Sequence, residues 1–171
     1  MVTRSAGCVF CEIVGGRAPA HRVGENGRAL AILDIHPYAP GHALVLSKRH
    51  VPIWHDLTSR EAADVFALAH TLAGKLRRVF KPEFVCLMAR GRRIPHTHVF
   101  LVPTRPGDVL DRYFNGLGNV QEASEELAPL REPASREEAA RRLRARRRVR
   151  SRRPAEGRRR SARSRPRGAG K

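Results

Sequence analysis

Apolar residues between Thr58 and Pro82 recur at spacings of three and four, a pattern that predicts one long amphipathic helix. Thr58 and Glu61 form a capping box at its start, in which the hydroxyl and the carboxylate satisfy amide donors that the helix leaves unpaired. Pro82 stops the helix, because proline has no amide proton and clashes with the preceding turn. The recurring apolar positions are Val65, Phe66, Ala69, Leu72, Ala73, Leu76 and Phe80.

Four short runs rich in Leu, Ile and Val predict strands of a sheet. The segment HPYAPG separates the first two runs and is typical of a turn, which predicts a hairpin-like pair. Alternate side chains of a strand share a face. His96, His98 and Phe100 are therefore expected to point to the same side. The predicted strands are residues 28–35, 42–47, 84–89 and 96–102.

The apolar pattern weakens in the C-terminal part of the chain. One helix is expected to include Leu110, Tyr113, Phe114 and Leu117, and residues 135–150 are expected to form another. Residues 151–171 lack apolar side chains to bury, which predicts disorder.

Length and charge divide the chain into a domain and an appendage. At 171 residues, it exceeds what one domain of ordinary size requires. The formal net charge of +18 resides mostly at one end, since residues 131–171 hold 18 of the 34 Lys and Arg and only 4 of the 16 Asp and Glu. We expect a folded domain over 1–106, a partly helical extension over 107–130, and an Arg-rich tail over 131–171.

Two interpretations of the Arg-rich tail remain open. Arginine runs neutralise phosphates and release counterions, so the tail can tether the domain to nucleic acid or another polyanion in a salt-dependent manner. No aromatic residue interleaves with the arginines after Phe114, so base stacking is not expected. The alternative is a solvated extension without a partner, enriched in Arg, Ala, Gly and Pro by coding bias.

The three cysteines indicate the compartment. An odd number, with two of them in a CxxC pair, does not form the disulfide framework of a secreted scaffold. The first residues lack the apolar core of a signal peptide, and no run approaches the roughly 20 apolar residues of a membrane span. We expect a protein of the reducing cytoplasm, without membrane association.

The CxxC pair, Cys8 and Cys11, is a candidate half of a metal site. Structural zinc takes four Cys or His ligands in a tetrahedron. His50 and His96 are the best candidates for the other half. A redox pair is the alternative, but it would follow a strand in a βαβ pattern, and no such strand precedes Cys8.

His96 and His98 form a second constellation. One imidazole can be anchored to metal while its neighbour acts as base or nucleophile. The alternatives are two structural histidines, or two zinc ligands. Asp34 ends an apolar strand just before the turn, where its carboxylate can accept two hydrogen bonds from a vicinal diol such as ribose; an Asx turn is the alternative there.

The order of these motifs resembles the histidine triad (HIT) family from about Cys8 to Pro103. CVFCEIV is followed by AILDIHPYAPGHALVLSKRH, the capped helix and PHTHVFLVP. The resemblance implies an α+β fold, with an antiparallel sheet of about five strands, one long and one shorter helix, and pairing into a homodimer. Family members bind nucleotides, and most hydrolyse or transfer nucleoside monophosphates from phosphoanhydride or phosphoramidate bonds.

The resemblance also implies residue roles. His98 matches the middle histidine, which attacks the α-phosphorus to give a nucleotidyl-histidine intermediate. His96 matches the first histidine, which joins the two cysteines and the histidine of KRH, here His50, on a structural zinc ion. Asp34 matches the carboxylate that binds ribose. Three further residues are expected near the base and sugar: Phe10, Ile35 and His36.

Two features depart from the family pattern. Phe100 stands where the third histidine is expected, and it has no donor for a phosphate or leaving-group oxygen. Ala89 stands in place of an asparagine, and the following phosphate loop is shortened to RGRRIP. Three arginines of this segment can supply the missing charge, because guanidinium groups pair with phosphate oxygens; a solvated basic loop is the alternative. These arginines are Arg90, Arg92 and Arg93.

Two functions follow from these observations. The first is a zinc-stabilised hydrolase or nucleotidyl transferase that acts on a purine nucleotide or dinucleotide through His98. The second is a catalytically weak or inactive nucleotide-binding protein, which the tail can tether to nucleic acid.

Overall fold

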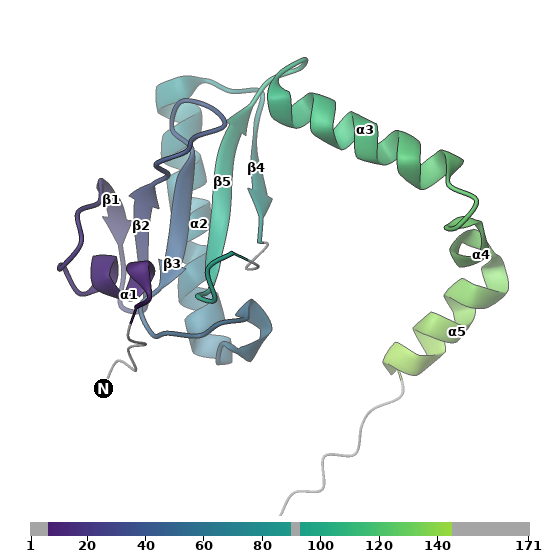
Figure 1. Cartoon of the computed structure of the whole chain (residues 1–171), viewed down its shortest axis with the longest axis horizontal. Helices are drawn as coiled ribbons and strands as arrows, with labels where there is room; N and C mark the ends of the chain where they lie inside the picture. Colours follow the sequence, from purple (N-terminus) through teal and green to yellow (C-terminus); the bar gives the residue numbers. More distant parts are fainter. Residues whose placement is uncertain (1–6, 90–92, 145–171) are drawn as a thin grey trace, which may run out of the picture. The chain divides into compact units, whose positions relative to one another are not determined.

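One antiparallel sheet of five strands, in the order β1-β2-β3-β5-β4, forms the centre of the computed structural model, which describes residues 7–89 and 93–144 (Figure 1). The α+β fold expected from the sequence is confirmed. The strands are β1 (Arg22–Glu25), β2 (Ala29–Leu33), β3 (Ala43–Ser47), β4 (Phe84–Met88) and β5 (His98–Thr104).

Four of these strands lie within the predicted runs or overlap them, whereas β1 was not predicted. Its sequence RVGE alternates too little to stand out, and its pairing with β2 shifts register between Arg22 and Gly24. It forms a strand because its backbone pairs with the free edge of β2. Gly24 pairs with Ala31, and Glu25 pairs with Leu30.

The predicted long helix is confirmed as α2 (Ser59–Phe80) and covers one face of the sheet. Its capping box is complete: Thr58 Oγ1 accepts from the Glu61 amide at 3.3 Å, and Glu61 Oε2 accepts from the Thr58 amide at 2.9 Å. The helix ends at Phe80, and Lys81 after it adopts a left-handed conformation before Pro82. The buried positions of α2 pack against alternate strand residues, among them Ala31, Val45, Val99 and Leu101.

The short helix α1 (Val9–Val14) packs on the opposite face (Figure 1). Six residues are too few for a helix to be stable alone. Phe10 and Ile13 are buried against the strand side chains that point away from α2, which are Leu30, Ile32, Leu44 and Leu46. The central strands are thus buried on both faces, and this explains their nearly continuous apolar sequences.

The described residues divide into two compact units, of which the first ends at Ala123 and the second begins at Ser124. The first contains the short 3₁₀ helix η1 (Trp54–Asp56) and α3 (Val109–Ala123), which confirms the helix expected around Leu110 and Leu117. The second contains α4 (Ala128–Arg131) and α5 (Pro133–Arg144). The predicted helix over 135–150 is therefore present up to Arg144. Its last residues and the predicted disordered end lie outside the described residues.

No helix in the described part of the chain is both long and apolar enough to cross a membrane.

Candidate functional site

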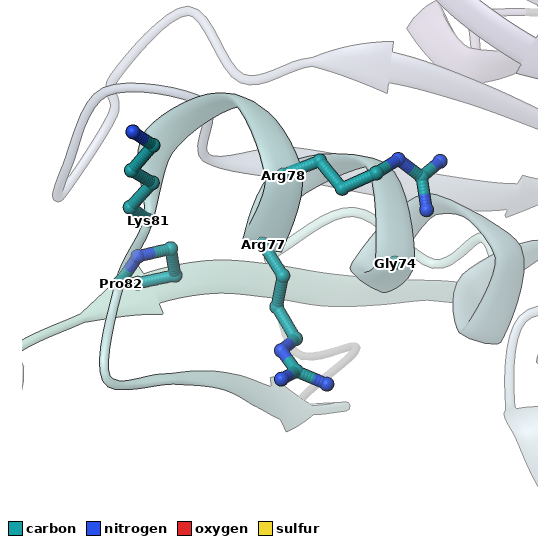
Figure 2. A pocket seen from close by; sticks show the side chains of 5 residues that line it. All are labelled: Gly74, Arg77, Arg78, Lys81 and Pro82. Carbon is teal, nitrogen blue, oxygen red and sulfur yellow. The ribbon is translucent and has the colours of Figure 1, made fainter.

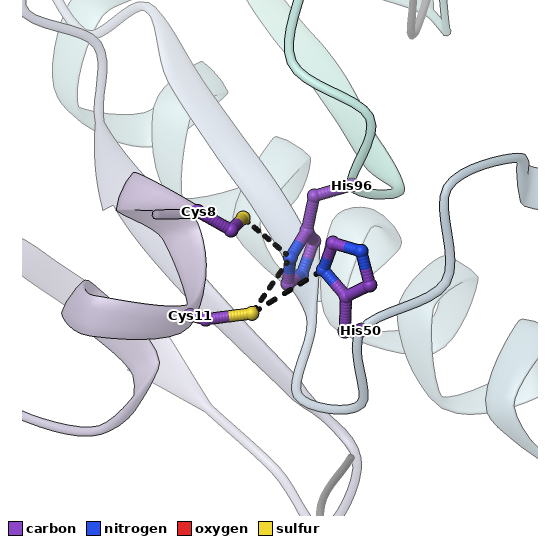
Figure 3. A group of neighbouring side chains, drawn as sticks. All are labelled: Cys8, Cys11, His50 and His96. Carbon is purple, nitrogen blue, oxygen red and sulfur yellow. Dashed lines mark hydrogen bonds between the residues drawn. The ribbon is translucent and has the colours of Figure 1, made fainter. Parts of the chain in front are cut away.

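Four side chains from separate parts of the chain meet beside the sheet: Cys8, Cys11, His50 and His96 (Figure 3). Cys8 occupies the N-cap position of α1 and Cys11 lies within the helix, so their spacing of three places both thiols on one side of it. His50 follows β3, and His96 precedes β5. One ligand atom from each residue lies within 4.8 Å of all the others.

The contacts of His96 determine which of its nitrogens faces the thiols. Its Nε2 lies 2.7 Å from the carbonyl oxygen of Ser47. A carbonyl only accepts, so Nε2 carries the proton and Nδ1 keeps its lone pair. Nδ1 lies 3.4 Å from Cys8 Sγ and 3.6 Å from Cys11 Sγ. Burial also lowers the pKa of His96 to about 4, so the ring is neutral at physiological pH, the form that binds a metal.

Arg49, the residue before His50, anchors this segment of the backbone through an ion pair. Arg49 donates two hydrogen bonds to Glu61, Nε to Oε1 at 2.6 Å and Nη2 to Oε2 at 2.7 Å. Because Glu61 also completes the cap of α2, the segment after β3 is tied to the start of that helix. This arrangement leaves His50 Nδ1 3.3 Å from Cys11 Sγ.

These distances fit a tetrahedral zinc site. With Zn–S near 2.3 Å and Zn–N near 2.0 Å, a tetrahedron separates sulfur from nitrogen by about 3.5 Å. The measured separations are 3.3 to 3.6 Å. The cluster, predicted from spacing and resemblance, has both the donor set and the geometry to hold a metal ion.

His98 begins β5 with its side chain buried. Its Nδ1 donates to the backbone oxygen of His96 at 2.6 Å, so the neutral ring carries its lone pair on Nε2. Phe10 packs edge-on against this ring, with centroids 5.1 Å apart, and also against His96 at 5.7 Å. Phe10, one of the two residues between the cysteines, therefore contacts both histidines.

The prediction that His96 and His98 lie on one strand was wrong. His96 lies in a bend after Pro95, where its amide donates to Ile94 O at 2.8 Å, and pairing with β3 starts only where His98 meets Leu46. The backbone amide of His96 is engaged in this tight turn, so it does not pair with a neighbouring strand.

The predicted alternation of the strand faces is confirmed. Phe100 packs with the α1 cluster, whereas Val99 and Leu101 belong to the α2 cluster.

Asp34 follows β2 directly. Its Oδ1 accepts from the His36 amide at 2.7 Å, which is the Asx turn considered as the alternative. The side chain is only 14% exposed. Its neighbours face solvent, with Ile35 84% exposed and His36 also exposed. Arg93 is exposed as well, whereas Arg90 and Arg92 lie outside the described residues.

Sequence reasoning gave no role to His42, which the structure places between Asp34 and Phe100. Its Nε2 lies 3.7 Å from Asp34 Oδ2. Its ring stacks on Phe100, with centroids 5.6 Å apart, and on Tyr38 at 5.3 Å. The sequence does contain a signal for this residue: His42 is a titratable side chain at the first position of an apolar run, immediately after a glycine.

An open pocket lies away from this site, at the C-terminal end of α2 (Figure 2). It is lined by Gly74, Arg77, Arg78, Lys81 and Pro82. The side chains of Arg77 and Arg78 extend in different directions, so their charges do not converge on one point.

Comparison with known proteins identifies relatives. An adenosine 5'-monophosphoramidase of Schizosaccharomyces pombe is 32% identical over 135 residues, which cover 75% of this chain and 96% of the relative. An adenylylsulfatase of Arabidopsis thaliana is 28% identical over 108 residues, which cover 60% of this chain and 55% of the relative. A zinc-bound histidine triad family protein from Mycobacterium smegmatis superposes with a TM-score of 0.57 at 34% identity, over 61% of this chain and 79% of that one.

The HIT domain family matches residues 16–107, which include every strand of the sheet and the whole of α2. The match spans more than half of the residues of the chain. The chain therefore belongs to the HIT domain family.

Proposed function

We propose that this protein binds purine nucleotides and hydrolyses a nucleoside phosphoramidate or phosphoanhydride, or transfers its nucleotidyl group, with His98 as the nucleophile. The observation that carries the proposal is the hydrogen bond from His98 Nδ1 to the backbone of His96, which leaves Nε2 as the reactive nitrogen. Two relatives with hydrolase names, the monophosphoramidase and the adenylylsulfatase, support this reaction class.

The reaction proceeds in two displacements at phosphorus. The Nε2 lone pair of His98 forms a bond to the α-phosphorus while the bond to the leaving oxygen or nitrogen breaks, and its electrons leave with that group. The oxygen of a water molecule then forms a bond to the phosphorus while the phosphorus–nitrogen bond breaks and its electrons return to Nε2. One proton of that water is released to solvent, which balances the proton taken up by the leaving group. The products are the nucleoside monophosphate and the restored imidazole. Covalent catalysis of this kind divides one difficult step into two.

Zinc on Cys8, Cys11, His50 and His96 would have a structural role in this proposal. A site closed by four protein ligands leaves no position for substrate and stabilises the fold. The cluster links α1 to the segment after β3 and to the segment before β5. His96 would thereby be held at the distance from which its carbonyl orients His98.

We place Phe100 at the third position of the triad motif. Phenylalanine has no donor for developing charge, and the loss of one such donor typically costs roughly 3 to 4 kcal/mol of barrier. The side chain packs between two imidazoles, 5.6 Å from His42 and 5.1 Å from His98, in an apolar setting. The second candidate is therefore a protein that binds nucleotides with little turnover. In either case we assign the ribose to Asp34, place the base and sugar near Phe10, Ile35 and His36, and assign the phosphates to Arg90, Arg92 and Arg93.

A homodimer is the proposed assembly. Strand β4 forms one edge of the sheet, and on it Phe84 is 50% and Leu87 is 47% exposed. An exposed apolar edge strand is a template for pairing with another chain. Light scattering tests this: twice the mass of one chain supports the dimer, and the mass of one chain contradicts it.

The Arg-rich tail is proposed as a tether to nucleic acid, on the strength of its charge alone. A chain truncated after Leu130 should then bind RNA and DNA less tightly than the full chain, with a smaller dependence on salt. Equal binding by both chains contradicts the tether.

The deciding experiment follows release of adenosine monophosphate from adenosine phosphoramidate and from a dinucleoside polyphosphate. It compares the unmodified protein with His98→Ala and with His70→Ala, which removes an exposed histidine of α2 as a matched control. Turnover that only His98→Ala loses supports the enzyme. Binding without turnover in all three proteins favours the second candidate, and no binding refutes both.

A further inference from the structure

His42 is a buried polar side chain with one unpaired nitrogen. The side chain has no solvent exposure. Its Nδ1 accepts from the backbone amide of Tyr38 at 3.3 Å. An amide only donates, so Nδ1 holds the lone pair and the proton of the neutral ring resides on Nε2. Among the described residues, Nε2 has no hydrogen-bond partner. A buried donor left unpaired is costly, and such groups usually have a reason to be retained.

The nearest acceptor is the carboxylate of Asp34. Its Oδ2 lies 3.7 Å from His42 Nε2, slightly beyond hydrogen-bond distance. The same two residues are joined through the backbone, where the Asp34 amide donates to His42 O at 3.0 Å. The backbone therefore holds the two side chains next to each other, and the pair lacks only a slightly closer approach of Oδ2 to Nε2.

The ring of His42 has little freedom to turn away. Tyr38 stacks on it with planes inclined by 22°, and Phe100 stacks on it with planes inclined by 28°. The direction of its N–H group is fixed by these contacts. The other carboxylate oxygen, Oδ1, is held by the His36 amide.

We propose that His42 is a positioning residue for ribose recognition: its Nε2–H holds the Asp34 carboxylate so that both oxygens present lone pairs to the vicinal hydroxyls of a nucleoside. The inference rests on the proposed nucleotide-binding function. Burial lowers the pKa of His42 and the Asp34 carboxylate opposes that shift. A neutral donor leaves the carboxylate its full negative charge, which makes it a strong acceptor for hydroxyls.

The test compares affinities for adenosine monophosphate and its 2',3'-dideoxy analogue, measured by titration calorimetry. Loss of hydrogen bonds to a charged group corresponds to roughly tenfold or more in affinity, and the unmodified protein should prefer the ribose form by this factor. His42→Phe keeps the stacked ring but removes the donor, so its preference should fall severalfold. His42→Gln, whose amide nitrogen can reach the position of Nε2, should restore it. Asp34→Ala should abolish it.

The outcomes separate the two proposals. An unmodified protein that binds neither ligand overturns nucleotide binding and this inference together. A ribose preference that His42→Phe leaves unchanged overturns only the role of His42.

A second measurement uses the unmodified protein and so does not depend on the folding of a variant. Histidine nitrogen NMR should report His42 as the Nε2–H form, with its proton signal moving when adenosine monophosphate is added but not when the dideoxy analogue is added. The Nδ1–H form, or equal movement with both ligands, overturns the assignment.

Discussion

The rings of Phe100 and His42 stack with centroids 5.6 Å apart and planes inclined by 28°. On the same strand face, Phe100 also contacts His98, with centroids 5.1 Å apart. The apolar ring of Phe100 thus lies next to the proposed nucleophile, at a position where an imidazole could donate a hydrogen bond to the reacting phosphate.

Replacing this ring by an imidazole should accelerate the reaction. We expect Phe100→His to raise kcat for a nucleoside phosphoramidate by about a hundredfold to a thousandfold, because the new ring supplies a donor to developing charge. Phe100→Leu removes the aromatic ring without adding a donor and serves as the control. Equal rates for the two variants would show that a missing donor does not limit turnover.

Metal should be required for stability. We expect the protein to purify with about one zinc ion per chain and Cys11→Ser to lose it, because three ligands remain of four. Loss of several kcal/mol of stability lowers Tm by roughly 10 °C or more. Cys86→Ser is the control, since Cys86 lies on β4 outside the cluster. Metal analysis and thermal melts with and without a chelator measure both effects; a chelator that leaves Tm unchanged contradicts the prediction.

The ion pair of Glu61 should contribute to stability in a specific pH range. Hydrogen bonds from Arg49, and then from Thr58, hold the pKa of Glu61 at about 2, below its ordinary value of 4.5. A depressed folded-state pKa adds stability that is fully present above pH 4.5 and is lost as the pH falls toward 2. With allowance for solvent screening at the half-exposed Arg49, Glu61→Gln should cost about 2 kcal/mol at pH 7.

Urea unfolding at a series of pH values measures this cost as the difference between the two proteins. The difference should shrink between pH 4.5 and pH 2, while acid effects common to both proteins cancel. Glu83→Gln, at an exposed position before β4, should show almost no difference at any pH. A cost for Glu61→Gln that stays constant with pH would refute the assignment.

Gly41 should tolerate substitution less well than a glycine with the same backbone conformation elsewhere. Gly41 and Gly107 both have positive φ, 85° and 76°, but a Cβ on Gly41 would overlap the ring of Phe80, whereas a Cβ on Gly107 would meet nothing within 4 Å. The left-handed conformation alone costs about 1 kcal/mol, and the overlap adds about 1 to 3 kcal/mol. Denaturant unfolding of Gly41→Ala and Gly107→Ala measures the difference; equal losses would mean that Phe80 moves aside freely.

Local signals made most of the fold predictable. The capping box and the apolar spacing of α2 depend on residues close in sequence, and the structure confirms both. The metal cluster was predicted from ligand chemistry, the CxxC spacing and the family resemblance, none of which requires the coordinates of the fold.

The missed features depend on distant contacts. β1 is a strand because of the edge of β2, and α1 is a helix because Phe10 and Ile13 pack on the sheet. The role of His42 is visible only once Phe100 and Tyr38 enclose its ring. No periodic pattern of apolar residues indicates which side chains will surround a given ring in the folded protein.

The pairing of Leu46 with His98 has a consequence for mobility. β5 lies between β3 and β4, so its amides are expected to exchange with solvent only when the whole domain opens. Asp34, in contrast, lies in the connection between β2 and β3, which has few ladder bonds to break. The connection between β2 and β3 would then adjust to different nucleosides. His98, the proposed nucleophile, would keep the same position whatever the leaving group.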